Sequence, residues 1–288
     1  MSVNSVNTNV GAMIALQSLN ETNSALAATE KQVSTGYRVA DATDDGAAYA
    51  VAQSVRSSVG ALTTANQQLG TVQGLLSTTQ SGLNNISNTM ASMRDVLVNL
   101  SNGGNSATQQ NSYITQYKSL LQNVQTFVQD TAYSGKTLIG NLTGSSGNFG
   151  KVTTIRNENG ATYTLATAGM SAVYNQITIT GILTNEKGAT LAGSIAAVIT
   201  SGGIFLTQMD TVGTALNTVG SEANYVTNQV KFNSDKIDSM NTGLGSLVDA
   251  DLAKESAQLQ ALQIRQQLGT QALSLANQAP QTLLSLFK

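Results

Sequence analysis

Between Val51 and Leu100 the chain carries one uninterrupted apolar repeat in alternating steps of three and four residues. Such steps place side chains on one face of an α-helix, and no Pro interrupts the run. At about 1.5 Å per residue the helix is roughly 75 to 85 Å long, too long for a compact globule of this size. We therefore expect an elongated fold. The stripe consists of Val51, Val55, Ser58, Leu62, Ala65, Leu69, Val72, Leu76, Thr79, Leu83, Ile86, Met90, Met93, Leu97 and Leu100.

Two further apolar series follow the same rule. A shorter one begins after the helix breaker Asn102-Gly103-Gly104-Asn105 and predicts a helix that folds back on the first: Ile114, Tyr117, Leu121, Val124 and Val128. The last third supplies a third series: Met209, Val212, Leu216, Val219, Ala223, Val226, Val230, Asn233, Ile237, Met240, Leu244 and Leu247. Three stripes of this kind can close one bundle. Asn233 is predicted to fix the register, and Gly243-Leu244-Gly245 to form a joint between two helices.

Both ends of the chain predict amphipathic helices that need partners. The apolar positions are Val10, Met13, Leu16, Leu19, Leu26 and Val33 at one end, and Leu252, Leu259, Leu262 and Leu273 at the other. Two helices alone shield too little apolar area to offset the entropy of ordering both segments. We therefore expect these positions to mediate self-assembly, with the ends disordered in a lone chain and helical in a polymer.

The pattern changes between Gly140 and Gly203, where short β-branched runs are separated by Gly and Asn. The runs Val152–Ile155, Thr162–Leu165 and Gln176–Thr180 are typical of strands. The pair Asn159-Gly160 suits a type I′ hairpin turn. These runs predict a small antiparallel β-domain of two hairpins, inserted into a mainly helical rod.

Composition excludes much of enzyme chemistry. The chain has no Cys and no His, so it lacks a thiolate nucleophile, a Ser-His-Asp triad and a Cys/His zinc site. We expect no enzymatic activity, cofactor or metal. The acidic set Asp41, Asp44 and Asp45 lacks the ligand order of a calcium loop, so Asp44 or Asp45 is predicted to cap the long helix, and Asp249 and Asp251 are likewise predicted to be caps.

Charge and hydropathy argue against two kinds of partner, nucleic acids and membranes. The 14 Lys and Arg residues are scattered, and the net charge of -2 gives no footprint for a phosphate backbone, so nucleic acid is not expected as a partner. Neither a membrane span nor a secretory signal is apparent, and we expect no membrane insertion.

Motifs at both termini resemble those of bacterial flagellin. The amino-terminal motifs are Val33-Ser34-Thr35-Gly36-Tyr37-Arg38-Val39 and Asp44-Asp45-Gly46-Ala47-Ala48. The carboxyl-terminal ones are Asp249-Ala250-Asp251, Gln266-Gln267-Leu268-Gly269-Thr270, Ala276-Asn277-Gln278-Ala279-Pro280-Gln281 and Leu284-Ser285-Leu286-Phe287-Lys288. The resemblance covers roughly Met1–Ile139 and Leu206–Lys288. It implies a structural subunit that self-assembles into a helical filament, the extracellular bacterial flagellum that serves motility.

The resemblance also divides the chain. Residues 1–43 and 248–288 would be inner-tube helices, 44–140 and 206–247 the two parts of the helical rod, and 141–205 a variable surface β-domain. It implies type III export without a cleaved signal, and as partners an export chaperone, a filament cap and hook-filament junction proteins.

By resemblance, two sets of surface residues carry further expectations. Met90, Arg94 and Asp95 lie in the segment read by an animal immune receptor for flagellin, where Ser92 replaces a usual basic residue. Thr143, Ser145 and Ser146 are candidates for O-linked sugars.

Two alternative functions stay open at this point. One is a hook-filament junction protein with similar termini, which a copy number per cell would separate from a filament subunit. The other is a cell-surface carbohydrate-binding protein that uses the β-domain, although aromatic platforms for sugars are scarce there.

Overall fold

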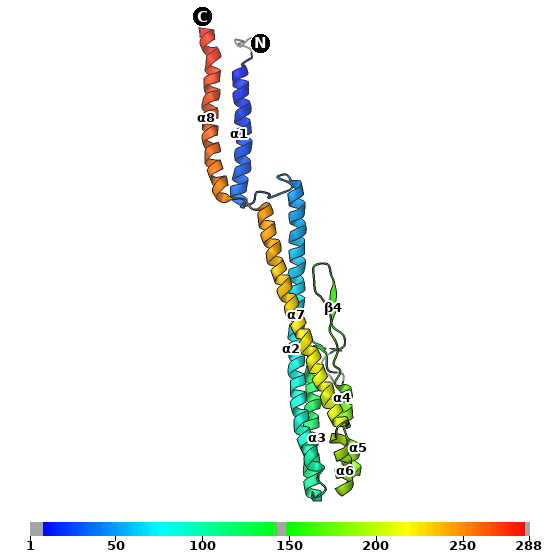
Figure 1. Cartoon of the computed structure of the whole chain (residues 1–288). Coiled ribbons are helices and arrows are strands. Elements are labelled where there is room, and N and C mark those ends of the chain that lie inside the picture. The colour runs from blue at the N-terminus through cyan, green and yellow to red at the C-terminus, as the bar shows by residue number, and fades with distance from the viewer. Residues whose placement is uncertain (1–7, 141, 143–147, 286–288) are drawn as a thin grey trace. The chain divides into compact units, whose positions relative to one another are not determined.

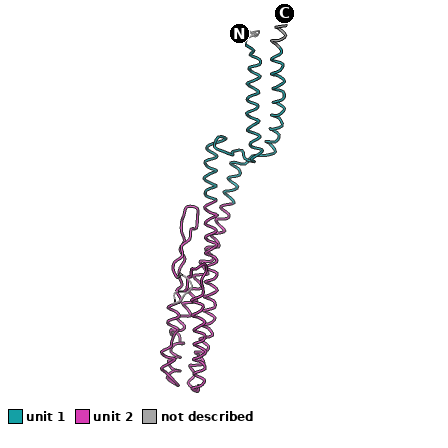
Figure 2. Tube along the Cα trace, turned by 180° about the vertical axis from the view of Figure 1, so that it is seen from behind, with its two compact units in different colours: residues 1–59, 238–288 teal, residues 60–237 magenta. Residues whose placement is uncertain are grey.

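A computed structural model describes residues 8–140, 142 and 148–285, and 77% of these described residues are helical (Figure 1). The elements are α1 (Val10–Thr35), α2 (Gly46–Leu100), α3 (Ala107–Asp130), β1 (Lys136–Thr137), β2 (Asn148–Phe149), β3 (Thr153–Ile155), β4 (Thr162–Thr164), α4 (Ser171–Ile177), α5 (Thr180–Asn185), α6 (Gly188–Ile199), α7 (Ile204–Val248) and α8 (Leu252–Ser285). They form two compact units (Figure 2): residues 1–59 with 238–288, and residues 60–237. We call these unit 1 and unit 2.

The apolar stripe of α2 is the core of unit 2. As predicted, α2 is one continuous helix of 55 residues, and its stripe is buried from Leu62 to Leu100. The prediction fails at the first turn, because Val51 is exposed while Ala48 and Ala52 are buried instead. Small side chains at the buried positions allow close packing there, which a pattern of large apolar residues cannot reveal.

The predicted second and third helices are confirmed as α3 and α7. The turn before α3 is fixed by a capping box, in which the Ser106 and Gln109 side chains each accept from the other residue's backbone N–H. Tyr117 of α3 is fully buried and donates a hydrogen bond to the Ile177 carbonyl at 2.6 Å. Burial raises the pKa of the Tyr117 hydroxyl, so the group stays a neutral donor.

One of the two predicted hairpins exists. Strands β3 and β4 pair antiparallel, with Thr154 opposite Tyr163. The connecting turn has a positive φ only at Gly160 (76°), whereas a type I′ turn needs positive φ at both central residues, so the predicted turn type is wrong. The Asn157 side chain closes the turn by accepting from the Ala161 N–H at 2.9 Å. A second, parallel pair joins β1 to β2.

The other predicted hairpin is wrong, because Gln176–Thr180 does not form a strand. Its residues end α4 and begin α5, and a third helix, α6, follows. Ile177 is fully buried, so burial in the core outweighs the strand preference of a β-branched run. The apolar side chains of this region join the core of unit 2 rather than forming a separate sheet: Leu165, Met170, Val173, Ile177, Ile179, Leu183, Leu191, Ile195 and Val198. The insert's proposed bounds, 141–205, stay a prediction.

Length and composition alone would let one helical stretch of the described residues, Gly188–Val248, cross a membrane. Its apolar part includes α6, where Leu191, Ile195 and Val198 are buried in the core of unit 2. Core helices of soluble proteins pass the same test, so this stretch is weak evidence for a membrane span.

A polar cluster fastens the β3–β4 hairpin to the helices of unit 2. Asn233 of α7 is fully buried, and its side-chain amide donates to Asn66 Oδ1 at 2.9 Å and to the Arg156 carbonyl at 3.0 Å. Gln229 donates to Asn233 Oδ1 at 2.9 Å, and Lys236 forms an ion pair with Glu158. The predicted register role of Asn233 agrees with these contacts, which join α2, α7 and the hairpin.

A second buried polar group is the side chain of Glu222 in α7. It lies where α7 meets the end of the β3–β4 hairpin that follows strand β4. Its Oε1 accepts from the Ala166 N–H at 2.7 Å, while Oε2 is buried without a hydrogen-bond partner among the described residues. The stacked rings of Tyr163 and Tyr225, with centroids 4.3 Å apart, hold the two elements together nearby. Burial raises the pKa of the Glu222 carboxyl above its usual 4.5, against the smaller lowering effect of the Ala166 hydrogen bond.

We predict that Asn233→Ala destabilises unit 2 by about 1–3 kcal/mol, because it removes the donor to the half-buried Asn66 amide oxygen, one of the two donors to the Arg156 carbonyl, and the acceptor for Gln229, which still donates to Arg156 at 3.3 Å. Urea unfolding followed by circular dichroism measures this loss. Asn228→Ala, at an exposed position of the same helix, is the control and should change little. Equal stability of the two variants would contradict the assigned role.

We predict that Glu222→Gln stabilises unit 2 at pH 7. A carboxyl whose pKa is raised on folding gives stability below its ordinary pKa, and that stability is lost as pH rises through the folded value. Gln keeps the acceptor for Ala166 and removes the buried charge. The urea midpoints of parent and variant should therefore differ at pH 7 and converge near pH 4. A constant difference across this range would disprove the explanation.

Candidate assembly surface

Helices α1 and α8 form an antiparallel pair in unit 1, so that the two chain ends lie at the same end of the pair (Figure 1). The Asn9 side chain caps α1 by accepting from the Ala12 N–H, and it also donates to the Ala276 carbonyl at 2.7 Å. Further along, Gln266 donates to Asn23 Oδ1 at 2.8 Å. These polar contacts fix the register of the pair.

An inward stripe on each helix forms the seam of this pair. On α1 it contains Leu19, Leu26 and Val33, and on α8 Leu259, Leu262 and Leu273, all buried or half-buried. Gly269 permits the close approach, since a Cβ there would lie 3.1 Å from Leu19 Cδ1. Within the described residues of the pair only Leu26, Thr29 and Leu262 are buried, and they keep 2% to 9% of their surface exposed, so the seam is thin.

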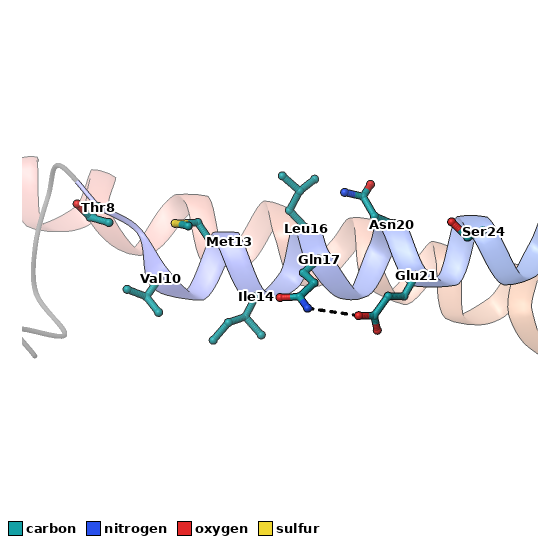
Figure 3. Close-up of a pocket in the computed structure, with 9 residues that line it drawn as sticks. All are labelled: Thr8, Val10, Met13, Ile14, Leu16, Gln17, Asn20, Glu21 and Ser24. Atoms are coloured by element: carbon teal, nitrogen blue, oxygen red, sulfur yellow. Dashed lines mark hydrogen bonds between the residues drawn. The ribbon is translucent and has the colours of Figure 1, made fainter.

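An outward stripe on α1 consists of the predicted Val10, Met13 and Leu16, and also Ile14. These four side chains are between 47% and 63% exposed. Figure 3 shows Val10 and Ile14 on one side of α1 and Leu16 on the other, along an open groove of about 890 Å³. Gln17 and Glu21, joined by a hydrogen bond of 3.4 Å, continue the groove (Figure 3). The predicted single stripe is therefore two stripes on different faces.

Helix α8 has an outward stripe of its own. Ile264, Leu268 and Leu275 form it and were missed, whereas the predicted Leu252 is exposed at the start of α8 on a different side of the helix; the four exposed fractions run from 50% to 71%. Ile264, Leu268 and Leu275 follow steps of four and seven that are offset from the seam positions, a signal that was present in the sequence. A contiguous apolar face of this kind on a soluble protein marks an interaction site.

The acidic loop between α1 and α2 is closed by a lysine. Lys31 Nζ lies 2.7 Å from Asp41 Oδ2 and 2.9 Å from Asp44 Oδ1, so an ammonium group occupies the place that a cation would take. The Lys31 hydrogen bond lowers the pKa of both carboxyls, and backbone and Thr43 hydrogen bonds lower them further. Asp45 caps α2 by accepting from the Ala48 N–H at 3.0 Å, as predicted. No cluster of three or more potential metal ligands exists among the described residues.

The joint between α7 and α8 lies at residues 249–251, so the prediction of a joint at Gly243-Leu244-Gly245 is wrong, and those residues continue α7. Here the chain pairs with the segment after α1: the Arg38 N–H donates to Val248 O at 2.8 Å, and the Ala250 N–H donates to Gly36 O at 2.9 Å. Asp251 caps α8 by accepting from the Ala253 N–H at 3.1 Å. Asp249 instead forms an isolated bridge with Tyr37, and no hydrogen bond shows its side chain as a cap.

The remaining predicted residues are not brought together with these surfaces. Arg94 and Asp95 are exposed on α2, whereas Met90 is fully buried in the core of unit 2. Thr143, Ser145 and Ser146 lie outside the described residues.

Comparison with known proteins gives the family. Residues 6–143 match the bacterial flagellin N-terminal helical region, and residues 203–287 match the bacterial flagellin C-terminal helical region. Flagellin FljK of Caulobacter vibrioides is 31% identical over 289 residues and 100% of both chains. A flagellin of Brucella melitensis biotype 1 is 32% identical over 99% of both chains. The chain belongs to the bacterial flagellin family.

As a flagellin, the chain is a structural subunit of the flagellar filament. A solved structure described as a flagellar hook-associated protein from Vibrio parahaemolyticus shares the fold, with a TM-score of 0.57 over 72% of this chain and all of that chain. At 16% identity it shows the fold alone. Neither the junction-protein nor the carbohydrate-binding alternative is favoured by these comparisons.

We predict that Lys31→Met raises the pKa of Asp41 and Asp44, because it removes the donor that stabilises both carboxylates. Their pKa is depressed in the folded chain, so the ion pair contributes stability above the ordinary Asp value of 3.8 and loses it as pH falls further. A carboxyl titration by NMR checks both midpoints. Unchanged midpoints in the variant would mean that the loop, and not Lys31, sets them.

Proposed function

We propose that this flagellin is exported and polymerises outside the cell through the outward stripes of α1 and α8. The observation that carries the proposal is that each helix has two apolar stripes and its partner helix covers only one. Burying exposed apolar surface contributes about 25 cal/mol per Å², so the four large side chains on the outward stripe of α1 and the three on that of α8 favour association. Other copies of a filament subunit are the natural cover for these faces.

The thin seam supports coupling between folding and assembly. With three side chains buried in the described α1–α8 pair, the seam contributes little against the entropy of ordering about 60 residues. The sequence predicted disorder of these segments in a lone chain, whereas the structure of the single chain has them as paired helices, so we expect the pair to be folded there but to be its least stable part. Packing the outward stripes against further copies supplies the missing burial.

Family membership supports the finer points of the proposal. Partners would be an export chaperone, a filament cap and hook-filament junction proteins, and the role would be structural rather than catalytic. The exposed Arg94 and Asp95 remain available to an immune receptor in a lone chain, with Ser92 lacking the usual basic group. Buried Met90 would act there only by holding the helix in place.

We predict that Leu16→Asp blocks polymerisation while the lone chain keeps the helix content of its parent. Leu16 is 47% exposed on the outward stripe, so the charge is solvated in the monomer and desolvated only in the filament. Sedimentation of the polymer, beside circular dichroism of the monomer, gives the two readouts.

Two matched variants sharpen this test. Leu262 is buried in the α1–α8 seam, so Leu262→Asp should lower the helix content of the lone chain as well as block the polymer. Val98 of α2 is 50% exposed, so Val98→Asp adds the same charge at a similar exposure outside the two stripes and should still polymerise. Normal filament yield from Leu16→Asp would remove α1's outward stripe from the assembly surface.

A further inference from the structure

Phe232 of α7 is the most exposed aromatic side chain among the described residues, with 59% of its surface open. Its neighbours one turn away on the same helix, Asn228 and Asp235, and the adjacent Lys231, are exposed and polar. A single large ring inside a polar rim has the anatomy of an interface hot spot. Nothing in the described part of unit 2 covers it.

A groove elsewhere in unit 2 has the opposite shape. It lies between the segment 166–170 and the stretch of α7 from Thr207 to Val219, with a volume of about 500 Å³. Met170, Ala215 and Val219 line it and are at most 6% exposed, which gives the groove an apolar floor. An apolar cavity of about 150 Å³ already holds benzene, so this groove has room for an aromatic ring.

Three threonines of the groove wall can be covered by an apolar side chain at low cost. Thr207, Thr211 and Thr218 each donate their hydroxyl hydrogen to the carbonyl four residues earlier, at 2.9 to 3.1 Å. Burying the wall therefore leaves no hydroxyl hydrogen of these three residues unpaired, which keeps the desolvation cost low.

The groove and the ring of one chain cannot meet. Both lie on α7, and 13 residues of helix separate Val219 from Phe232, or about 20 Å along the axis. A filament, however, is built from heterologous contacts, in which one patch of a subunit meets a different patch of the next. An aromatic ring that fills the groove would then come from another copy of the same chain.

We propose that Phe232 of one subunit inserts into the groove between residues 166–170 and α7 of a neighbouring subunit. The proposal deepens the filament function and rests on it. Charge constrains how the ring can enter, because exposed Asp210 lines the groove and the ring has one exposed neighbour of each sign. Lys231 would attract Asp210 and Asp235 would repel it, so the contact requires an orientation that brings Lys231 toward Asp210 and leaves Asp235 in water.

The absence of Cys from the chain allows a direct test. Phe232→Cys and Thr214→Cys are prepared as separate variants and polymerised together under mild oxidation. Each chain then carries one thiol, so a disulfide can join only two different copies. Because half of the subunits keep Phe232, the mixed polymer still assembles. A disulfide requires Cα atoms within about 7 Å, so it reports contact between the two sites.

The expected result is a disulfide-linked dimer in the mixed polymer, absent from either variant polymerised alone and from the dilute mixture. In addition, Phe232→Ala should raise the critical concentration of the polymer about tenfold or more, as loss of a hot-spot aromatic does. Val98→Ala, which truncates another exposed apolar residue of unit 2, is the control and should leave it unchanged.

Two results would overturn the proposal in distinguishable ways. Mixed polymers of normal yield without the dimer, together with an unchanged critical concentration for Phe232→Ala, would overturn this contact and leave the filament function standing. Failure of the unmodified chain to polymerise would overturn the proposed function and this contact with it.

Discussion

Burial of the α2 stripe between Leu62 and Leu100 is the interaction on which unit 2 depends. An isolated helix is marginal in water, and most helical stability in proteins comes from packing an apolar face. Helices α3, α4, α6 and α7 all contribute buried apolar residues to the cluster that contains this stripe. The hairpin is then added by polar contacts, above all those of Asn233, which have geometric requirements that apolar packing lacks.

Unit 1 is packed less completely than unit 2. Its helices α1 and α8 bury one stripe in a thin seam and leave another in water, which a soluble monomer has no reason to keep. The same chain thus combines a well-packed unit with a pair of helices that is incomplete alone. In the proposed assembly through these stripes, this difference in burial would let a subunit gain much of its apolar contact when it joins other copies.

Periodicity made the long helices predictable because a 3-4 repeat over many turns has only one structural solution. The repeat did not separate the two stripes of α1. Leu16 and Leu19 fit one apolar series in the sequence, yet Leu19 lies in the seam with α8 and Leu16 lies on the outward stripe. Local strand preference failed at Ile177-Thr178-Ile179, where Ile177 ends α4, Thr178 and Ile179 form the break before α5, and both Ile side chains are buried in the core. Asp45 and Asp251 were predictable as caps from sequence alone, whereas the pairing of Lys31 with Asp41 depends on a loop that returns to its own helix.

Hydroxyl groups on the long helices lower the cost of placing these helices against another subunit. Many exposed Ser and Thr residues donate to the carbonyl four residues earlier, among them Thr64 and Thr71 of α2. Because these hydroxyl hydrogens are already bonded inside the helix, covering them would leave fewer polar groups unsatisfied. Only 10% of the residues are charged, so few charges would lose their hydration in the proposed filament contacts.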